Sequence, residues 1–299
     1  LQQRNAPDYG ACADCYAAPL ARGGKFRRHG RPTMSFKLSV ITATRNRKDF
    51  LPRCLDSVAA QACADKEHIV IDGGSTDGTS ELLADYAARH PHLKWISEPD
   101  RGISHAMNKG LAMATGNAVG VIGDDDFYQP DVFNSIAEEF LQHPEAGIVS
   151  GHCAVINNAD QLISTERAMF TTRRELLECW RCWGRRVMLP APSTFIRRQV
   201  IDAVGGFDEA DRYAMDYRHW IKITERFPVR ILDRTLATFR HDAGTTSFSN
   251  NRQQWEETLA ISKQYWGSKL KLQFYALWFS HWRHFHYPQW RQRLAAMVK

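Results

Sequence analysis

Apolar and polar residues follow two different periods along most of this chain. Short β-branched and apolar runs bounded by polar turns predict strands, and apolar residues that recur every third or fourth position predict amphipathic helices. The expected strands cover residues 37–42, 67–71, 94–97 and 118–122, and the expected helices residues 48–61, 79–90, 104–115 and 131–143. Because strands alternate with helices, we expect βαβ units and an α/β fold, with a mostly parallel sheet flanked by helices.

The two ends of the chain break this alternation. Residues 1–33 show no sustained apolar period and are rich in Gly, Pro, Ala and Arg. We interpret them as a leader that is disordered or lies upstream of the native start, with a basic tail that touches phosphate or lipid as the alternative. Residues 34–250 make up the expected α/β domain, and residues 251–299 an amphipathic helical extension rich in aromatic residues. That extension either packs on its own domain or in a dimer, or lies on an anionic membrane surface.

Composition narrows the class of protein. The 299 residues carry a formal net charge of +6, which favours anionic partners such as nucleotide phosphates or lipid headgroups. The basic residues form no stripe among aromatic side chains, so we expect no nucleic acid partner. Seven scattered cysteines indicate a reducing compartment, and no apolar stretch is long enough to span a membrane. We therefore expect a cytoplasmic protein, at most peripheral at the inner face of the membrane.

Three consecutive carboxylates follow the fourth expected strand. Asp124, Asp125 and Asp126 come directly after the apolar run that ends at Ile122. Like charges this close resist ionisation unless a cation or a hydrogen-bonding ligand compensates them. Mg²⁺ and Mn²⁺ prefer carboxylate and phosphate oxygens, and Mg²⁺ is typically held by one or two carboxylates plus substrate phosphates. The triplet therefore favours a divalent metal bound together with a diphosphate, and a solvated acidic turn is the alternative.

A glycine-rich turn, DGGSTDGT, follows the second expected strand and begins at Asp72. Gly73 and the glycine after it let a ligand approach the main chain, and Asp72 offers an acceptor to a base or a sugar. Asp77 is a candidate cap of the next helix, and a plain capped turn is the alternative to a ligand site. The turn has neither a Walker A nor a G-x-G-x-x-G pattern. Since ligands bind at the carboxyl ends of parallel strands, we expect this turn and the acidic triplet to share one crevice.

Several segments together resemble the family 2 glycosyltransferases. They are LSVITATRNRKDFLPRCLDSVAAQ, HIVIDGGSTDGT, WISEPDRGISHAMNKGLAMATG and VIGDDDFYQPDVF in the family's order, followed by STFIRRQVIDAVGGFDE and YAMDYRHWIKI on the acceptor side. The resemblance runs from Lys37 to Ser247. It implies the GT-A fold, a nucleotide-sugar donor, a divalent metal (Mn²⁺ or Mg²⁺) and inversion at the anomeric carbon.

The resemblance also implies roles for individual residues. The implied donor contacts are Thr42, Ala43, Arg45, Asp72, Gly73, Asp100, Arg101, Gly102, Asn108, Lys109, Asp124 and Asp125. Asp126 is the expected metal ligand, with Asp124 and His241 as further ligands, although a structural role is the alternative for His241. Asp216 occupies the place of the catalytic base, and its position at the start of an apolar-patterned helix also suits an N-cap.

Two segments depart from the family pattern. Ser104 and His105 stand where many relatives carry Tyr and Asp, and Gly123 stands where Asn or Asp is frequent. Both segments belong to the region that shapes the donor pocket. The departures therefore bear on which donor sugar is used and leave the expected chemistry unchanged.

Taken together, these features predict a metal-dependent inverting glycosyltransferase of polysaccharide biosynthesis. It would move a sugar from a nucleotide-sugar, with a UDP-sugar as the first expectation, to a glycan or a lipid-linked sugar. A sugar-nucleotide-binding protein without transfer activity and a nucleotidyltransferase are the alternatives. A nucleotidyltransferase would need further basic residues around a triphosphate and would lack the acceptor motif around Asp216, and a binding protein would be indifferent to an Asp216→Asn change.

Overall fold

The computed structural model describes residues 36–63, 65–178, 187–241 and 251–266, together with the single residues Tyr275 and Phe279. The predicted leader lies outside this part, as do residues 179–186, residues 242–250 and most of the predicted C-terminal extension beyond Trp266. Among the described helices, none combines the length and the apolar character that crossing a membrane requires.

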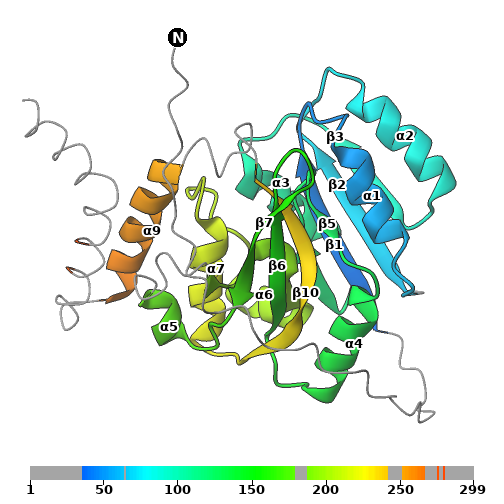
Figure 1. The fold of residues 1–299 in the computed structure, drawn as a ribbon. Coiled ribbons are helices and arrows are strands. Elements are labelled where there is room, and N and C mark those ends of the chain that lie inside the picture. The colour runs from blue at the N-terminus through cyan, green and yellow to red at the C-terminus, as the bar shows by residue number, and fades with distance from the viewer. Residues whose placement is uncertain are drawn as a thin grey trace, which may run out of the picture. The chain divides into compact units, whose positions relative to one another are not determined.

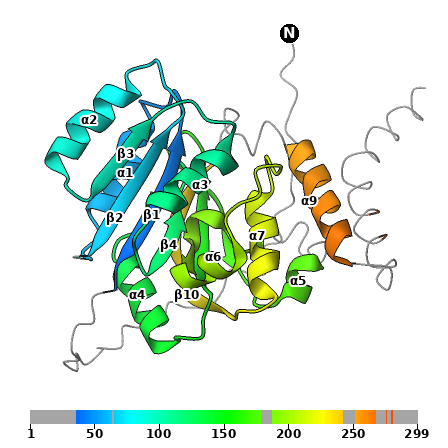
Figure 2. The same ribbon diagram turned by 180° about the vertical axis from the view of Figure 1, so that it is seen from behind.

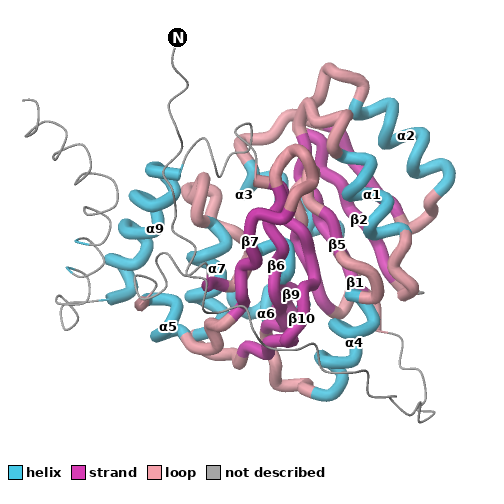
Figure 3. The backbone as a smooth tube through the Cα atoms, viewed as in Figure 1, coloured by secondary structure: helices cyan, strands magenta, loops and turns pink. Residues whose placement is uncertain are grey.

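The described strands join into one ten-stranded sheet (Figures 1 and 3). Its main path runs through β3 (Leu93–Ser97), β2 (Lys66–Asp72), β1 (Leu38–Thr44), β4 (Ala118–Val121), β9 (Thr194–Arg197), β6 (Ile148–Ile156), β10 (Val229–Arg240) and β5 (Phe127–Tyr128). Off this path, β7 (Leu162–Ala168) pairs with β6, and β8 (Val187–Met188) pairs with β7. β1 is parallel to β2 and β4, and β6 is parallel to β10, whereas β9 runs antiparallel between β4 and β6. The prediction of a mostly parallel sheet is confirmed.

Helices cover both faces of the sheet (Figures 1 and 2). They are α1 (Leu51–Ala59), α2 (Thr79–Arg89), α3 (Ile103–Met113), α4 (Val132–Gln142), α5 (Arg173–Leu177), α6 (Arg198–Val204), α7 (Met215–Thr224) and α9 (Asn251–Trp266), with a 3₁₀ turn at Ala191–Ser193. The first four match the predicted helices to within three residues at each end. α1 begins later than predicted because Pro52 is accepted only in the first turn of a helix.

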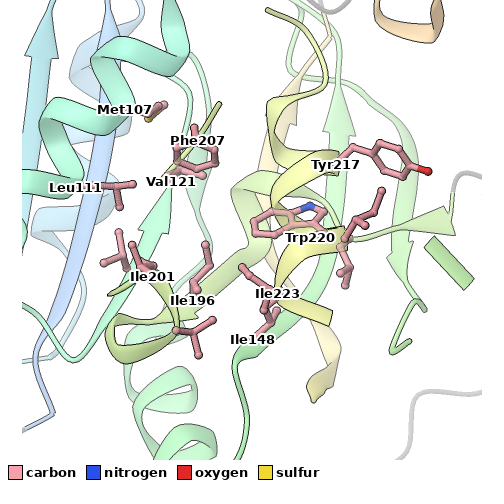
Figure 4. Packing of buried hydrophobic residues seen from close by; sticks show 14 of the residues in the cluster. Met107, Leu111, Val121, Ile148, Ile196, Ile201, Phe207, Tyr217, Trp220 and Ile223 are labelled. Carbon is pink, nitrogen blue, oxygen red and sulfur yellow. The ribbon is translucent and has the colours of Figure 1, made fainter. Parts of the chain in front are cut away.

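Alternate residues of β1 pack into cores on opposite faces of the sheet. Val40 belongs to the cluster beneath α1 and α4, whereas Ile41 belongs to the cluster beneath α3, α6 and α7, part of which Figure 4 shows. α3 can lie close to β1 because Gly110 has no side chain, since a Cβ there would come within 2.4 Å of Ile41 Cγ2. The spacing of α3 from the sheet is therefore set by this one glycine contact.

Glu67 ties several elements together at the amino end of the sheet. Its side chain is 2% exposed and accepts hydrogen bonds from Ser39 Oγ at 2.6 Å, Lys94 Nζ at 2.7 Å and the Thr115 N–H at 2.6 Å, and Lys37 Nζ lies 3.1 Å away. Burial opposes its charge, yet these donors together lower the pKa of Glu67 to about 2.

α9 packs against α5 and α7 (Figures 1 and 2). Ile261 and Ser262 are fully buried, and Ser262 Oγ lies 2.8 Å from the Tyr217 hydroxyl on α7. Residues 251–266 therefore form a helix that packs on the domain. The apolar face predicted further along lies outside the described residues.

Candidate active site

Polar loops after four neighbouring parallel strands meet at one edge of the sheet. The loop after β1 reaches the turn after β2 through Asn46, whose Oδ1 accepts a hydrogen bond from the Thr76 N–H at 2.8 Å. The same loop reaches the acids after β4 through Arg47. The turn after β2 touches the loop after β3 at Gly73, where a Cβ would lie 2.6 Å from Asp100 Oδ2. The two turns that were predicted to share a crevice therefore both contact the loop after β1.

One arginine partly neutralises the acidic triplet. Arg47 Nε lies 3.4 Å from Asp124 Oδ1, and Arg47 Nη2 forms a short ion pair with Asp125. Asp126 is 3% exposed, and its Oδ1 accepts a hydrogen bond from the Arg240 N–H at 2.9 Å. Burial, and then the charge of Asp125, raises the pKa of Asp124 to about 6, and burial likewise raises the pKa of Asp125 and of Asp126. The triplet therefore sets three carboxyl groups beside one guanidinium, and burial disfavours the charged form of each.

The chemistry of the triplet suits a hard divalent cation. Its donors are carboxylate oxygens, and a positive ion beside them would favour the charged forms that burial disfavours. Gly123 leaves room for them, since a Cβ there would lie 2.7 Å from Asp126 Oδ2 and 3.2 Å from Asp125 Oδ1. Within the described residues no group of three or more His, Cys, Asp or Glu side chains forms a ready-made metal cage. The residues thus fit an ion held by one or two carboxylates and completed by a ligand's phosphate oxygens.

His241 does not join the acids in such a group. Its N–H donates to the Ile156 carbonyl at 2.8 Å, which continues the pairing of β10 with β6, and its ring lies 6.3 Å from that of Phe239. The predicted ligand set of Asp124, Asp126 and His241 is therefore not assembled in this structure, because the β6–β10 ladder fixes the course of the chain at His241.

β1 extends two residues further than predicted, which changes the side chains that reach the edge. Thr42 is fully buried, and its Oγ1 lies 3.0 Å from His68 Nε2 inside the sheet's core. The predicted place of Thr42 in the nucleotide pocket stays a prediction, because in this structure its hydroxyl contacts His68 within the core. Ala43 is half-buried against the core, and Arg45 is exposed beside the glycine-rich turn. From the loop after β1, Arg47 forms ion pairs with the acids.

Asp72 supports the glycine-rich turn from within. It is fully buried, and Oδ2 accepts hydrogen bonds from Ser97 Oγ at 2.5 Å and Ser80 Oγ at 3.2 Å. Its predicted contact with a base stays a prediction, because in this structure the carboxylate serves the turn itself. Asp77 Oδ1 accepts from the Thr79 N–H at 3.0 Å, but Gly78 holds the N-cap position of α2 and no side chain caps it there, so Asp77 is not the N-cap.

The loop after β3 carries Asp100, Arg101 and Gly102 into α3. Asp100 Oδ1 accepts the Gly102 N–H at 2.8 Å, and Gly102 has φ +129°, a conformation that favours glycine. Arg101 is 71% exposed and forms an ion pair of 2.6 Å with Glu209 in the segment before α7. The loop is therefore tied to the acceptor-side segment by an exposed ion pair.

Two neighbouring residues of α3 have different surroundings. The side-chain amide of Asn108 exchanges two hydrogen bonds of 2.9 Å with the backbone of Phe207, so it holds the segment before α7 and does not face the edge. Lys109 Nζ lies 2.7 Å from Glu98 Oε1 and donates to the Pro99 carbonyl at 3.1 Å. Of these two predicted diphosphate contacts, Lys109 is the one that lies beside the loop after β3.

Ser104 and His105, which depart from the family pattern, also lie at this junction. Ser104 is buried, and its Oγ donates to the Asp211 carbonyl at 2.7 Å. His105 Nδ1 accepts the Arg101 N–H at 3.2 Å. Ser104 therefore connects the start of α3 with the segment before α7, and His105 connects it with the loop after β3. Neither side chain supplies the carboxyl or phenol group that many relatives carry there.

Asp216 lies in the first turn of α7. Ala214 holds the N-cap position and no side chain caps this helix, so the capping alternative is wrong. Asp216 is half-buried, and Oδ1 accepts from the Tyr217 N–H at 2.7 Å. Burial raises the pKa of Asp216 to about 6, and the charges of Glu257 and Asp211 add to this. Such a carboxylate is ionised at neutral pH and is a stronger base than an ordinary aspartate.

The end of β4 and the start of α7 belong to one packed cluster. Val121 is the last residue of β4, and Figure 4 shows it beside Phe207, with Tyr217 and Trp220 of α7 in the same cluster. The strand that leads to the acidic triplet and the helix that carries Asp216 therefore pack in one core.

Comparison with known proteins places these features in a family. Residues 39–205 match the family model described as Glycosyl transferase family 2. Chondroitin synthase of Escherichia coli is 26% identical over 198 residues, which is 66% of this chain and 28% of that protein. A PGL/p-HBAD biosynthesis glycosyltransferase of Mycobacterium bovis is 36% identical over 115 residues, which is 38% of this chain and 45% of that protein. The chain thus spans less than half the length of these curated relatives.

Solved structures share the fold. S. aureus TarS 1-349 in complex with UDP-GlcNAc superimposes with a TM-score of 0.60 at 18% identity, covering 77% of this chain and 67% of that chain. Mannosyltransferase PcManGT from Pyrobaculum calidifontis, in complex with GDP-Man and Mn²⁺, gives a TM-score of 0.60 at 20% identity, covering 86% of this chain and 72% of that chain. The predicted GT-A fold is confirmed.

Proposed function

Since this chain belongs to glycosyl transferase family 2, we propose that it transfers a sugar from a nucleotide-sugar donor to an acceptor hydroxyl, with inversion at the anomeric carbon. The observation that carries the proposal is the ion pairing of Arg47 with Asp124 and Asp125 at the carboxyl edge of the sheet. Buried acids in excess of their cation, with Lys109 at the neighbouring loop, suit a diphosphate bound together with a divalent ion.

The donor we propose is a nucleoside diphosphate sugar, with a UDP-sugar as the first expectation. The two structural neighbours carry UDP-GlcNAc in one case and GDP-Man with Mn²⁺ in the other, which supports this class of donor. Asp126, joined by Asp124 or Asp125, would hold a divalent ion, which when bound would neutralise charge on the departing diphosphate. Arg101 and Lys109 would donate to the phosphate oxygens in place of their present carboxylate partners.

Asp216 is the proposed catalytic base. It takes the proton of the acceptor hydroxyl while the hydroxyl oxygen forms its bond to the anomeric carbon. The bond from that carbon to the phosphate oxygen breaks on the opposite face, and the nucleoside diphosphate leaves with the electron pair. Because attack and departure lie on opposite faces, the configuration inverts. A base in this position contributes about 10²- to 10⁴-fold to the rate.

We propose a glycan or a lipid-linked sugar as the acceptor, in polysaccharide biosynthesis. A relative named chondroitin synthase supports this class. Tyr275 and Phe279 are 60% and 56% exposed, and exposed aromatic side chains one turn apart suit peripheral contact with the inner face of the cytoplasmic membrane.

Calorimetric titration with UDP and then GDP, each with and without Mn²⁺, tests the donor site. We expect metal-dependent binding of one nucleotide by the wild type, its loss in Asp126→Ala, and no change in the control Asp85→Ala, which alters an exposed carboxylate on α2. Binding of neither nucleotide would contradict the proposal. Binding without turnover of UDP-GlcNAc or GDP-mannose, unchanged in Asp216→Asn, would instead identify a sugar-nucleotide-binding protein.

A further inference from the structure

The segment just before α7 is held by α9, an element beyond the residues that match the family model. Glu257 of α9 accepts the Arg212 N–H on Oε1 and the Tyr213 N–H on Oε2, both at 2.7 Å. Gln254, one turn earlier on α9, donates to the Tyr213 carbonyl at 3.2 Å. One carboxylate thus satisfies two consecutive backbone donors three and four residues before Asp216.

Other contacts hold the same segment from its remaining sides. Ser104 of α3 donates to the Asp211 carbonyl at 2.7 Å. The Asp211 carboxylate receives Arg218 Nη2 at 2.9 Å together with a shorter contact from Arg218 Nε. Arg218 also donates to Gln264 of α9 at 2.6 Å. The segment is therefore fixed to α3, α7 and α9 together, and the Glu257 carboxylate of α9 accepts the hydrogen bonds of its backbone N–H groups.

The charges that face Asp216 differ in how they are compensated. From the preceding segment comes Asp211, whose charge Arg218 offsets with two hydrogen bonds. From α9 comes Glu257, for which no ion pair with a cation is found among the described residues, since its oxygens meet only backbone N–H groups. On α7 itself, burial lowers the pKa of His219, one turn further on, to about 4, so it is neutral at physiological pH. Glu257 is thus the carboxylate whose charge acts on Asp216 without a paired cation.

We propose that Glu257 is a positioning residue for the base: it fixes the backbone from which α7 starts and places a negative charge beside the segment that leads into Asp216. This inference rests on the proposed function, in which Asp216 accepts the acceptor's proton. Its two effects are separable. The hydrogen bonds hold Asp216 in place, whereas the charge makes it a stronger base.

Titration of the Asp216 carboxyl carbon by ¹³C NMR tests the charge effect without any substrate. Asp216→Asn assigns the resonance. We expect Glu257→Gln to move the midpoint to lower pH by roughly half a unit or more, since a like charge is removed. Glu256→Gln is the matched control, because Glu256 is the adjacent residue of α9 and pairs with Arg252 on the exposed face. Equal midpoints in Glu257→Gln and Glu256→Gln would overturn the inference.

Turnover of the donor, measured as UDP release from UDP-GlcNAc or GDP release from GDP-mannose, tests the positioning effect. Glu257→Asp keeps the charge but shortens the side chain, so we expect the Asp216 midpoint to stay near that of the wild type while kcat falls roughly tenfold at unchanged KM. An unchanged kcat in Glu257→Asp would overturn the positioning role. If the wild type consumes neither donor, the proposed function fails, and the NMR titration still decides whether Glu257 acts on Asp216.

Discussion

Arg47 Nε lies 3.4 Å from Asp124 Oδ1, and this ion pair joins the loop after β1 to the acids after β4. The same guanidinium pairs with Asp125. Burial raises the pKa of both carboxylates, so their charged forms near neutral pH depend on the cation beside them. The acidic edge of the sheet is therefore held by charge balance, unlike the apolar cores beneath it.

Arg47→Met should destabilise the metal-free protein at pH 7.5 by roughly 1–3 kcal/mol, because it leaves two largely buried carboxylates without their cation. At pH 5, below the raised pKa of Asp124 (about 6), that carboxyl is mostly protonated and the loss should be much smaller. Thermal melts at the two pH values measure the difference. Arg45→Met, in an exposed residue of the same loop, is the control. An equal loss at both pH values would show that Arg47 acts through packing.

Donor turnover should decrease as the pH falls through about 6. Asp216 accepts a proton only when it is ionised, and its pKa is raised to about 6 by burial and then by the neighbouring carboxylates. Below that pH the rate should drop tenfold per pH unit, and above it the rate should level off. Asp216→Asn should reduce turnover by about 10²- to 10⁴-fold without loss of nucleotide binding. A rate that stays constant from pH 7 down to about pH 4 would contradict the raised pKa.

Glu67 should make the fold sensitive to acid. Its folded-state pKa of about 2 lies below its ordinary value of 4.5, so the stabilisation is complete above pH 4.5 and is lost as the pH falls from there towards 2. Glu67→Gln should therefore cost about 3 kcal/mol at pH 7 and markedly less at pH 3. Chemical denaturation at the two pH values measures this cost. The exposed Glu138→Gln on α4 should change stability by less than about 0.5 kcal/mol.

The first half of the fold was predictable from the sequence because its signals are local. Each βαβ unit shows its own period of apolar residues, and turn residues such as Pro52 set the ends of the helices. The antiparallel insertion of β9 between β4 and β6 was not predicted, since strand order depends on contacts between residues far apart in the chain.

The site was predictable only as far as its side chains follow strand ends. The acidic triplet and the glycine-rich turn lie where parallel strands finish, and the structure brings their loops together. The end of β1 was set two residues early, so the loop that carries Arg47 to the acids was taken to begin at Ala43. Glu257 gave no signal, because an exposed glutamate in a helix and one that binds two backbone N–H groups have the same local sequence.

Asn108 and Lys109 provide a direct test of which residues of one motif contact the donor. Asn108 exchanges two hydrogen bonds with the Phe207 backbone, so Asn108→Ala should cost about 2 kcal/mol of stability, at roughly 1 kcal/mol for each bond. Lys109 instead pairs with Glu98 beside the loop after β3. Lys109→Ala should leave stability nearly unchanged, because such ion pairs contribute little, but should weaken nucleotide binding about tenfold.

Denaturation curves and calorimetric titration of UDP with Mn²⁺, measured on both variants, separate the two roles. The affinity lost in Lys109→Ala should shrink as salt is raised, since a charge contact with phosphate is screened, whereas the stability lost in Asn108→Ala should not depend on salt. Should Asn108→Ala instead lose affinity at full stability, its amide would face the diphosphate as the family resemblance implies. The bonds to Phe207 would then have to break when the donor binds.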